Sequence, residues 1–472
     1  MADFKAYLDE LEQDFVIDTE KLKNITAHFV QELEKGTALL SNSAQELKAL
    51  TETIGLSITG GNIPMNPTWV MNYPNGNETG KYLVLDLGGT NLRVYSIQLT
   101  NEKGGFEIKQ ESHKLPEELK TATADELWDF VAGCLETFLQ SADLDLSTEI
   151  DLSFIFSFPT TQSTIDEGIL QRWTKGFNIS NTEGVDAAES LRQAIKKKNL
   201  PLKVCVVTND TTATMMASAY LNSETEIGCV FGTGCNGAYF EKVDAIPKLA
   251  KDNLKGELFM AINCEWGAFD NKHAVLPLTS YDIAIDNDSP RKGQQAFEKM
   301  VAGLYLGELF RRIILDIHQR DPQSFLEGQS VERLTDSYCL DSSFLSAIEE
   351  DTSDGLREAY ETCVSSLGIS PTHAELQFMK AVATLITIRA ARLSATGVAA
   401  ICQKRDLQKC HVGVEGSLFE KHPHFQLELS KTVSEILASE AEPESRKDNV
   451  EFMLSPGSGV GAAVIASTLK HR

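Results

Sequence analysis

The chain has 472 residues, which is too long for one simple core, so we expect two domains or one elaborated domain. With 42% hydrophobic and 24% charged residues, its composition is that of an ordinary globular protein. The formal net charge of −25 repels phosphate backbones and anionic lipid, which argues against nucleic acid or a membrane surface as the main partner. A nucleotide site on this chain would need local hydrogen-bond donors and a divalent cation.

The N-terminal stretch and the cysteines favour a cytoplasmic protein. MADFKAYLDELEQDF lacks the cationic start and apolar run of a signal peptide. No segment approaches the run of about eighteen apolar residues that a membrane helix needs. None of the nine cysteines forms a C-x-x-C pair, so the sequence predicts neither a zinc site nor a disulfide framework. We expect reduced, mostly buried thiols and no membrane span.

The first part of the chain predicts a helix and then a connecting segment. In residues 20–35 apolar side chains recur at helical spacing, with Asp18 as the expected cap and Gly36 as the expected end. Residues 62–80 are rich in Pro, Gly and Asn and indicate a linker at a domain boundary.

Strand-like and helical segments follow in a mixed order. Strands are expected at 83–97, 149–159, 202–210 and 226–241, and a helix at 211–221. Helices dominate from about Gln294 onward. Residues 411–419 and 450–470 each have a strand–glycine–helix pattern.

Two segments share one form: LVLDLGGTNLRVYSI and CVFGTGCNGAYFE are each an apolar strand, a Gly/Thr-rich turn and a second strand. A Rossmann fingerprint or a P-loop would open a helix after its glycines, and neither segment does. The remaining phosphate-binding option is a hairpin whose turn amides form an anion nest, with Thr90, Asn91 and Thr233 adding donors. Either turn alone is equally well a hairpin without a ligand. Two matching turns favour a phosphate clamped between two related halves.

Two aspartates stand at the ends of predicted strands. Asp86 comes directly before the first turn, where it would repel phosphate unless it faces a metal. Holding Mg²⁺ through water is the natural role, and a turn-capping aspartate is the alternative. Asp210 ends LKVCVVTND, at the strand end where ligands gather in α/β sheets. On local grounds alone, an N-cap role for Asp210 is favoured.

Longer motifs resemble the eukaryotic hexokinase family, particularly its fungal-type hexokinases and glucokinases: SFPTTQSTIDEGILQRWTKGF, TNDTTATMMA, FGTGCNGAYFE, MAINCEWGAFDN and SPRKGQQAFEKMVAGLYLGEL. The resemblance extends from about Phe15 to Ser467. It implies an α/β fold of the actin-like ATPase (ribonuclease H-like) class with two domains around a deep cleft. The small domain would comprise residues 75–208 plus 456–472, and the large domain residues 1–74 plus 209–455.

The resemblance also implies a role for each matching residue. Asp210 would be the catalytic base, with Lys175 offsetting the developing negative charge. The sugar would be bound by Ser157, Thr174, Lys175, Asn209, Asp210, Asn236, Glu265 and Glu298. The nucleotide would be bound by Asp86, Leu87, Gly88, Gly89, Thr90, Asn91 and Thr233 in the two turns and by Gly307, Gly416 and Ser417 on the adenosine side. Asp86 would hold Mg²⁺ through water.

These residue types suit a sugar, because a ring of hydroxyls both donates and accepts hydrogen bonds, as amides and carboxylates can match. We therefore expect ATP-dependent phosphorylation of glucose at its 6-hydroxyl for glycolysis, with other hexoses left open. The partners would be glucose and Mg²⁺-ATP, in a cytoplasmic monomer or homodimer. His422 and His424 lack a third ligand for a metal and are expected at the surface.

Three positions depart from the family's pattern: Ala213 replaces a usual Gly, and Glu415 and Pro456 each replace a usual Asp. All three lie on the nucleotide side, so they bear on ATP affinity. One alternative is thus a glucose-binding sensor or regulator with little or no kinase activity. Another is an actin-like or chaperone ATPase without a sugar, against which WTKGF, Glu265 and Glu298 argue.

Overall fold

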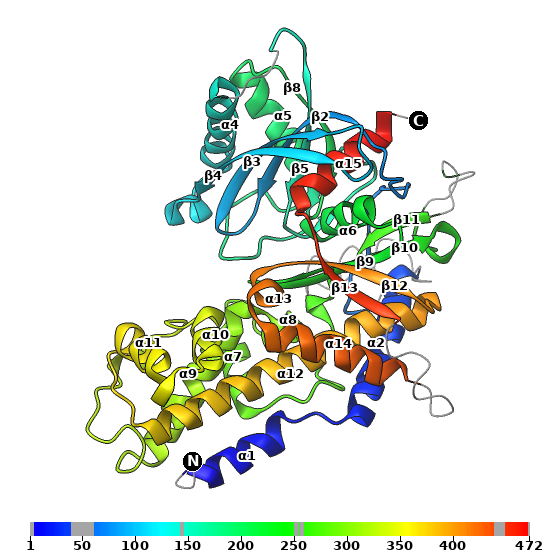
Figure 1. Ribbon diagram of the computed structural model, residues 1–472. Coiled ribbons are helices and arrows are strands. Elements are labelled where there is room, and N and C mark those ends of the chain that lie inside the picture. The colour runs from blue at the N-terminus through cyan, green and yellow to red at the C-terminus, as the bar shows by residue number, and fades with distance from the viewer. Residues whose placement is uncertain are drawn as a thin grey trace.

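The computed structural model describes residues 4–38, 61–141, 146–249, 254, 259–438 and 449–470, and these form two lobes, each built on one main β-sheet (Figure 1). The five-stranded lobe has the strand order β4-β3-β2-β5-β8, and the six-stranded lobe has the order β1-β11-β10-β9-β12-β13. The strands are β1 Asn66–Pro67, β2 Gly80–Leu87, β3 Asn91–Leu99, β4 Phe106–Lys114, β5 Ile150–Phe156, β6 Thr160–Thr161, β7 Ile169–Leu170, β8 Leu202–Thr208, β9 Thr225–Phe231, β10 Cys235–Lys242, β11 Phe259–Asn263, β12 Cys410–Glu415 and β13 Val450–Leu454.

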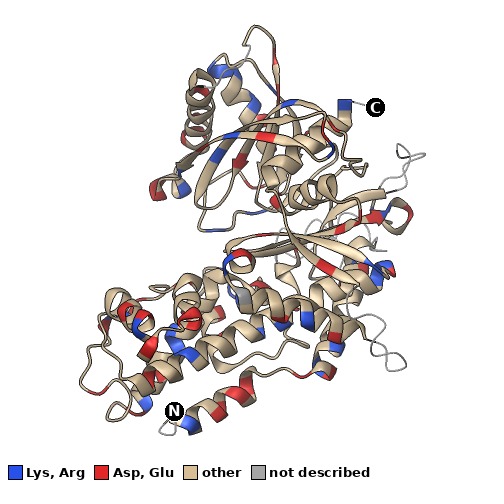
Figure 2. Cartoon of the chain, viewed as in Figure 1, with Lys and Arg blue, Asp and Glu red and all other residues tan. Residues whose placement is uncertain are grey.

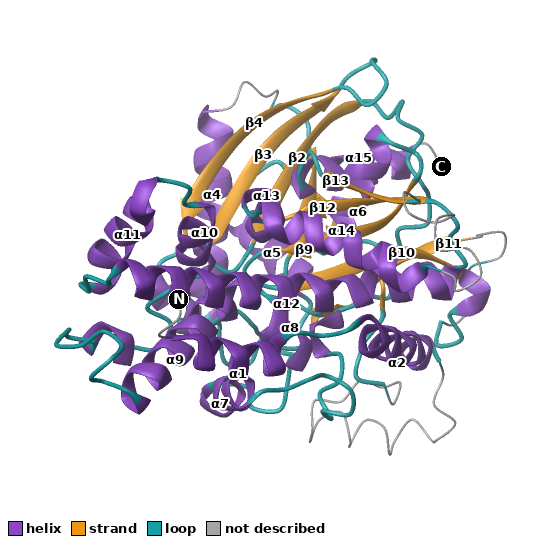
Figure 3. Ribbon diagram, turned by 60° about the horizontal axis from the view of Figure 1, so that its bottom comes forward, coloured by secondary structure: helices purple, strands orange, loops and turns teal. Residues whose placement is uncertain are grey.

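Helices cover both sheets, and most of them belong to the six-stranded lobe. They are α1 Lys5–Phe15, α2 Thr19–Thr37, α4 Ala124–Ser141, α5 Ala187–Lys197, α6 Asp210–Leu221, α7 Ser280–Asp288, α8 Ala296–Val301, α9 Gly303–Arg320, α10 Ser342–Glu350, α11 Arg357–Leu367, α12 His373–Arg405, α13 Ser417–Lys421, α14 Pro423–Leu437 and α15 Ser458–Lys470. Turning the molecule shows α12 as the central helix of this lobe, with α2, α9 and α14 packed along it (Figure 3).

The two sheets repeat one strand pattern. In the five-stranded lobe β4, β3 and β2 pair antiparallel, and β2, β5 and β8 pair parallel. In the six-stranded lobe β11, β10 and β9 pair antiparallel, and β9, β12 and β13 pair parallel. The hairpins β2–β3 and β9–β10 therefore occupy equivalent places. The prediction of two related halves, each carrying one glycine-rich hairpin, is confirmed.

Helices α6 and α15 join the lobes where the chain leaves the last strand of each sheet. They pack on each other, while α6 also contacts β9 and β12 and α15 contacts β2 and β5. Each helix thus lies against the sheet of the other half. The two backbones approach so closely that a Cβ atom at Gly461 would stand 1.7 Å from the carbonyl oxygen of Ala213. Ala213 is fully buried in the core that these helices share with β2 and β3.

The predicted linker does connect the lobes. Residues 66–67 pair with β11 of the six-stranded sheet, and β2 of the other sheet begins at Gly80. The chain therefore crosses between the lobes within the Pro- and Gly-rich segment. The exact domain bounds given above stay a prediction.

Local sequence signals predicted most helices and strands, but the predicted C-terminal end of α2 was wrong. Asp18 caps α2 by accepting a hydrogen bond from the amide of Lys21, as predicted. The helix continues through Gly36 to Thr37. A Cβ atom at residue 36 would lie 2.2 Å from the Met65 side chain, so the glycine permits close packing and does not end the helix.

Burial separates the core from the charged surface. Helix α12 has an 18-residue window apolar enough to span a membrane by composition, but 89% of that window is buried inside the protein. Seven of the nine cysteines are buried, as expected. His422 was expected at the surface and is 2% exposed, because it lies beside Glu349 of α10. Lys and Arg positions are interspersed with Asp and Glu positions in both lobes (Figure 2).

The α6–α15 contact makes a testable prediction about stability. Gly461→Ala places a methyl group against the Ala213 carbonyl, and such overpacking costs about 1–3 kcal/mol. Gly133→Ala in α4 is the matched control, since its Cβ would meet nothing within 4 Å and alanine favours a helix by about 1 kcal/mol. Thermal unfolding should therefore shift down for the first variant and slightly up for the second. Equal midpoints would contradict the crossing described here.

Candidate active site

Asp210 lies where β8 ends and α6 begins, at the junction of the two lobes. The side chain of Asn209 caps the helix by accepting a hydrogen bond from the amide of Thr211 at 2.8 Å. Asp210 is the first residue of α6, and its Oδ1 accepts from the amide and hydroxyl of Thr211 at 2.7 and 3.1 Å. The N-cap interpretation of Asp210 is thus wrong, because Asn209 takes that place. The carboxylate of Asp210 stands at the helix N-terminus, where the dipole favours negative charge.

A network of amides and one carboxylate lies next to this helix end. Asn236 on β10 donates through Nδ2 to Asn263 at 2.8 Å, to Glu265 at 3.3 Å and to Asn209 at 3.5 Å. Asn263 on β11 donates to the same oxygen of Glu265 at 2.9 Å. The amide of Glu265 returns a bond to Oδ1 of Asn236 at 3.0 Å. These bonds fix the orientation of three predicted sugar-binding side chains, Asn209, Asn236 and Glu265. Asn263 was missed, although it lies in the quoted MAINCEWG motif.

Glu298 on α8 faces the second glycine turn. Its Oε2 accepts from the amide of Cys235 at 3.1 Å, and its Oε1 accepts from Gln295 Nε2 at 3.4 Å. A Cβ atom at Gly234 would stand 2.8 Å from Oε2, so a larger residue here would require the Glu298 carboxylate to shift. Burial raises the pKa of Glu298 and likewise that of Glu265. Neither residue is fully buried as a whole.

The five-stranded lobe contributes the segment around WTKGF. Lys175 Nζ donates to the carbonyl of Ser157 at 2.7 Å, and the amide of Ser157 donates to the carbonyl of Leu87 at 3.3 Å. The side chain of Lys175 also lies against Gly89, where a Cβ atom would be 2.8 Å from it. Ser157 is buried, whereas Lys175 is exposed at the turn that begins with Thr174. The predicted sugar segment and the first glycine turn are therefore in contact.

Three of the thirteen non-glycine residues with positive φ in the described part of the chain lie at this junction. Lys175, Glu265 and Gln295 adopt left-handed conformations with φ of 57°, 57° and 56°. A non-glycine residue held in a sparsely populated region costs of order 1–3 kcal/mol, and such residues cluster at active sites. Two of the three were predicted site residues, and Gln295 was not.

The two glycine turns stand open at their tips. In the first turn the amide of Gly88 donates to the carbonyl of Asn91 at 3.1 Å, and Thr90 is exposed. In the second, the amide of Gly232 donates to the carbonyl of Gly234 at 3.0 Å, and Thr233 is exposed. Both tips can thus reach a ligand, as a phosphate site requires.

Gly416 borders the second turn, and both its backbone conformation and the space around it require glycine. Its φ is 122°, and a Cβ atom would lie 2.4 Å from the carbonyl oxygen of Phe231. Ser417 follows as the first residue of α13 and is exposed. The strand–glycine–helix pattern predicted for 411–419 is confirmed, and it brings both predicted nucleotide residues beside the second turn.

Gly307 lies on α9, and its predicted place on the adenosine side stays a prediction. A Cβ atom there would lie 2.3 Å from the carbonyl oxygen of Leu340, so this glycine serves the packing of α9. One helical turn earlier, the amides of Gly303 and Leu304 donate to the carbonyls of Gly232 and Thr233 at 2.8 and 3.4 Å. The start of α9 therefore borders the second turn. The same GLYLGEL motif contains both glycines.

Three carboxylates interact across the nucleotide side. Asp86 is 5% exposed and accepts from Arg93 at 3.1 Å. Burial raises the pKa of Asp86 to about 7; Arg93 opposes the shift, and Asp210 and Glu415 add to it. Glu415 Oε2 accepts from the Thr214 hydroxyl at 2.9 Å and from the Ser458 amide at 2.8 Å.

This arrangement fits a hydrated divalent cation. A cation would relieve the repulsion among Asp86, Asp210 and Glu415, and carboxylate oxygens are the ligands that Mg²⁺ prefers. Among the residues that the structure describes, no group of three or more His, Cys, Asp or Glu is arranged to hold a metal directly.

Comparison with known proteins agrees with this geometry. Two family models, both described as Hexokinase, match residues 7–220 and 226–468. A hexokinase of Emericella nidulans is 50% identical over 468 residues, which cover 98% of this chain and 91% of the relative. Hexokinase-1 of Saccharomyces cerevisiae is 41% identical, with 100% and 94% covered. Glucokinase-1 of the same yeast is 35% identical, with 97% and 96% covered.

Among solved structures, a hexokinase from Schistosoma mansoni complexed with glucose superposes with a TM-score of 0.84 at 30% identity, and 98% of this chain and 99% of that chain are covered. The α/β actin-like fold with two domains, expected from the sequence motifs, is thereby confirmed. With family models over nearly all of its length and relatives of up to 50% identity among those compared, this chain belongs to the hexokinase family of hexose kinases.

Proposed function

We propose that this protein transfers the terminal phosphoryl group of ATP to the 6-hydroxyl of glucose. The observation that carries the proposal is the position of Asp210. It lies at a helix N-terminus, next to the hydrogen-bond network of Asn209, Asn236 and Glu265. Its negative charge also raises the pKa of Asp86, which precedes the first glycine turn. A carboxylate between a hydrogen-bonding cradle and a phosphate turn suits a base that deprotonates a sugar alcohol.

In this mechanism the protein binds, orients and moves one proton. Glu265, Glu298 and Asn236 would hold the sugar hydroxyls, and the five-stranded lobe would add Ser157 and Thr174. Asp210 would take the proton of the 6-hydroxyl, a contribution worth about 10²–10⁴ in rate. Lys175, held by the Ser157 carbonyl and resting on Gly89, would offset negative charge that develops beside the first turn.

The nucleotide would lie across the two glycine turns, with its adenosine end toward Gly416 and Ser417. Bound Mg²⁺ would neutralise charge on the outer phosphates, with Asp86 holding its water shell and Glu415 nearby. The positioning of these groups supplies most of the catalysis in phosphoryl transfer. The cytoplasmic location and the monomeric or dimeric state remain part of this proposal.

The departures on the nucleotide side favour the kinase over a sensor without catalysis. The longer side chain of Glu415 links two helices, because its Oε2 accepts from the Thr214 hydroxyl of α6 and from the Ser458 amide of α15. Pro456 stands in the short connection between β13 and α15, where the Ser455 amide donates to Val414 at 2.8 Å. Each substitution is therefore accommodated by local structure that leaves both glycine turns intact.

The central test is Asp210→Ala, measured with glucose, fructose, mannose and N-acetylglucosamine in a coupled assay for the phosphorylated sugar. We expect the wild type to phosphorylate glucose and the variant to lose at least about 10² in kcat. Binding of glucose, followed by calorimetry, should persist in the variant because the amide network is untouched. Wild-type protein that binds glucose without turnover would favour the sensor instead.

A second test uses the raised pKa of Asp86. Below pH 7 this carboxyl is protonated in the folded protein and no longer attracts a cation, so the KM for Mg²⁺-ATP should rise about tenfold between pH 8 and pH 6 at saturating Mg²⁺. Arg93 holds the pKa of Asp86 down, so Arg93→Met should move this rise to higher pH. A KM that is flat over this range in both proteins would contradict the role of Asp86.

A further inference from the structure

The motif KHPHF has no part in the proposed function, and the structure buries its first histidine. His422 and Glu349 are both almost fully buried. Nε2 of His422 lies 3.4 Å from Oε1 of Glu349, and the hydroxyl of Thr387 on α12 donates to the same oxygen at 2.6 Å. An imidazole, a carboxylate and a hydroxyl therefore meet in the interior of the six-stranded lobe.

This contact is a poor source of stability. Oε2 of Glu349 and both ring nitrogens of His422 are buried and have no hydrogen-bond partner among the described residues. Taking a carboxylate and an imidazole out of water is unfavourable unless their polar atoms are paired. Apolar side chains of similar volume often stabilise such a place equally well. The pair is therefore better explained by the elements that it joins.

The pair joins two helices at their C-terminal ends. Glu349 is the penultimate residue of α10, and His422 directly follows α13 and precedes α14. Helix α13 has only five residues, from Ser417 to Lys421. Because α13 is so short, a contact at its last turn fixes the position of the whole helix.

Both helices begin beside the second glycine turn. A Cβ atom at Gly303 would lie 3.0 Å from the carbonyl oxygen of Gly232 and 3.0 Å from Oγ of Ser342, the first residue of α10. A Cβ atom at Gly232 would lie 3.5 Å from Cα of Gly416, the residue before α13. The N-terminal ends of α10 and α13 thus both lie close to this turn, while the buried pair links their C-terminal ends.

We propose that Glu349 and His422 form a brace that sets the position of α13 relative to α10, and with it the position of Gly416 and Ser417 beside the second turn. The ligand whose binding depends on the brace is a nucleoside di- or triphosphate. Both are positioning residues, since they act through α13. The inference rests on the proposed function, in that the nucleotide is taken to lie at this turn.

The test is a double-mutant cycle with Glu349→Leu, His422→Leu and the double variant. The dissociation constant of Mg²⁺-ADP is read by calorimetry, which needs no turnover. Each single variant should weaken this binding about tenfold, and the double variant should be no weaker than the worse single one, since all three lack the same contact. The dissociation constant of glucose should change less than about twofold, because effects at separate sites are nearly independent.

Thermal unfolding separates a positioning role from a role in stability. Each single variant leaves one buried polar group without its partner, so its midpoint should fall. The double variant removes both groups, so its midpoint should return toward that of the wild type, whereas its affinity for Mg²⁺-ADP should stay low. Glu349→Gln, which keeps the shape and can still hydrogen-bond to the ring, should recover most of the affinity.

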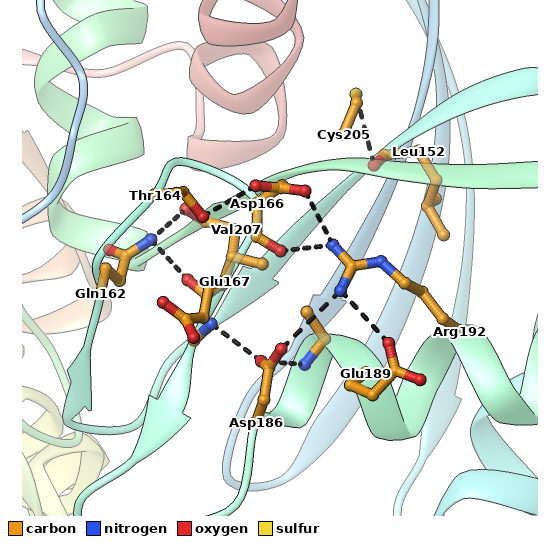
Figure 4. Close-up of polar contacts among 12 residues, drawn as sticks. Leu152, Gln162, Thr164, Asp166, Glu167, Asp186, Glu189, Arg192, Cys205 and Val207 are labelled. Carbon is orange, nitrogen blue, oxygen red and sulfur yellow. Dashed lines mark hydrogen bonds and ion pairs between the residues drawn. The ribbon is translucent and has the colours of Figure 1, made fainter.

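The control is Arg192→Met, which removes ion pairs from the other lobe. Arg192 on α5 donates to the carbonyl and carboxylate of Asp166 at 2.6 and 3.1 Å and lies 3.7 Å from Asp186 and Glu189, all within the five-stranded lobe (Figure 4). This variant should lower the thermal midpoint and leave the binding of Mg²⁺-ADP and of glucose unchanged.

The brace would be overturned by an affinity for Mg²⁺-ADP that returns together with the thermal midpoint in the double variant. Additive losses, unchanged affinity in both single variants, or an equal loss in Arg192→Met would overturn it as well. If a leucine variant does not fold, Glu349→Asp, which shortens the side chain, takes its place and should also lose affinity for Mg²⁺-ADP. Wild-type protein that binds Mg²⁺-ADP without kinase activity would end the proposed function, while the cycle would still decide whether the pair positions a nucleotide.

Discussion

The close crossing of α6 and α15 is the constraint on which the site depends. Each helix leaves the last strand of one sheet and packs against the sheet of the other half. Because Gly461 lets α15 approach the Ala213 carbonyl, α6 is packed closely between α15 and the sheet of the six-stranded lobe. The N-terminus of α6 carries Asp210. The candidate base is thus placed by packing between the lobes, and the two glycine turns are brought to it from opposite sides.

The candidate site is acidic, as the whole chain is, and yet it would bind an anionic nucleotide. A protein with a net charge of −25 gathers Asp86, Asp210 and Glu415 on the nucleotide side and Glu265 and Glu298 on the sugar side. Arg93 opposes the rise that burial causes in the pKa of Asp86, and Arg172 opposes the rise in the pKa of Glu265. An anionic ligand at these turns would depend on their backbone amides for its attraction.

The sequence allowed the hairpins and the Asp18 cap to be predicted, because each depends on neighbours within a few positions. The long motifs also named Asn209, Asn236 and Glu265 together, and the structure brings these three into one hydrogen-bond network, while their binding roles stay predictions. The errors share one cause, which is a partner distant in sequence. Met65 explains why Gly36 does not end α2. Likewise, His422 is buried next to Glu349, which lies more than seventy positions earlier in the chain.

The repeated strand order also bears on how such a chain arises. Two sheets with the same sequence of antiparallel and parallel neighbours, each opening with a glycine-rich hairpin, are what duplication of one ancestral segment would leave behind. In the part of the chain that the structure describes, α7 to α12 all lie between β11 and β12 of the second copy, whereas α4 and the 3-10 helix Glu117–Thr121 lie between β4 and β5 of the first. Much of the difference in size between the two copies therefore comes from one interval, and each copy still ends in one of the paired helices α6 and α15.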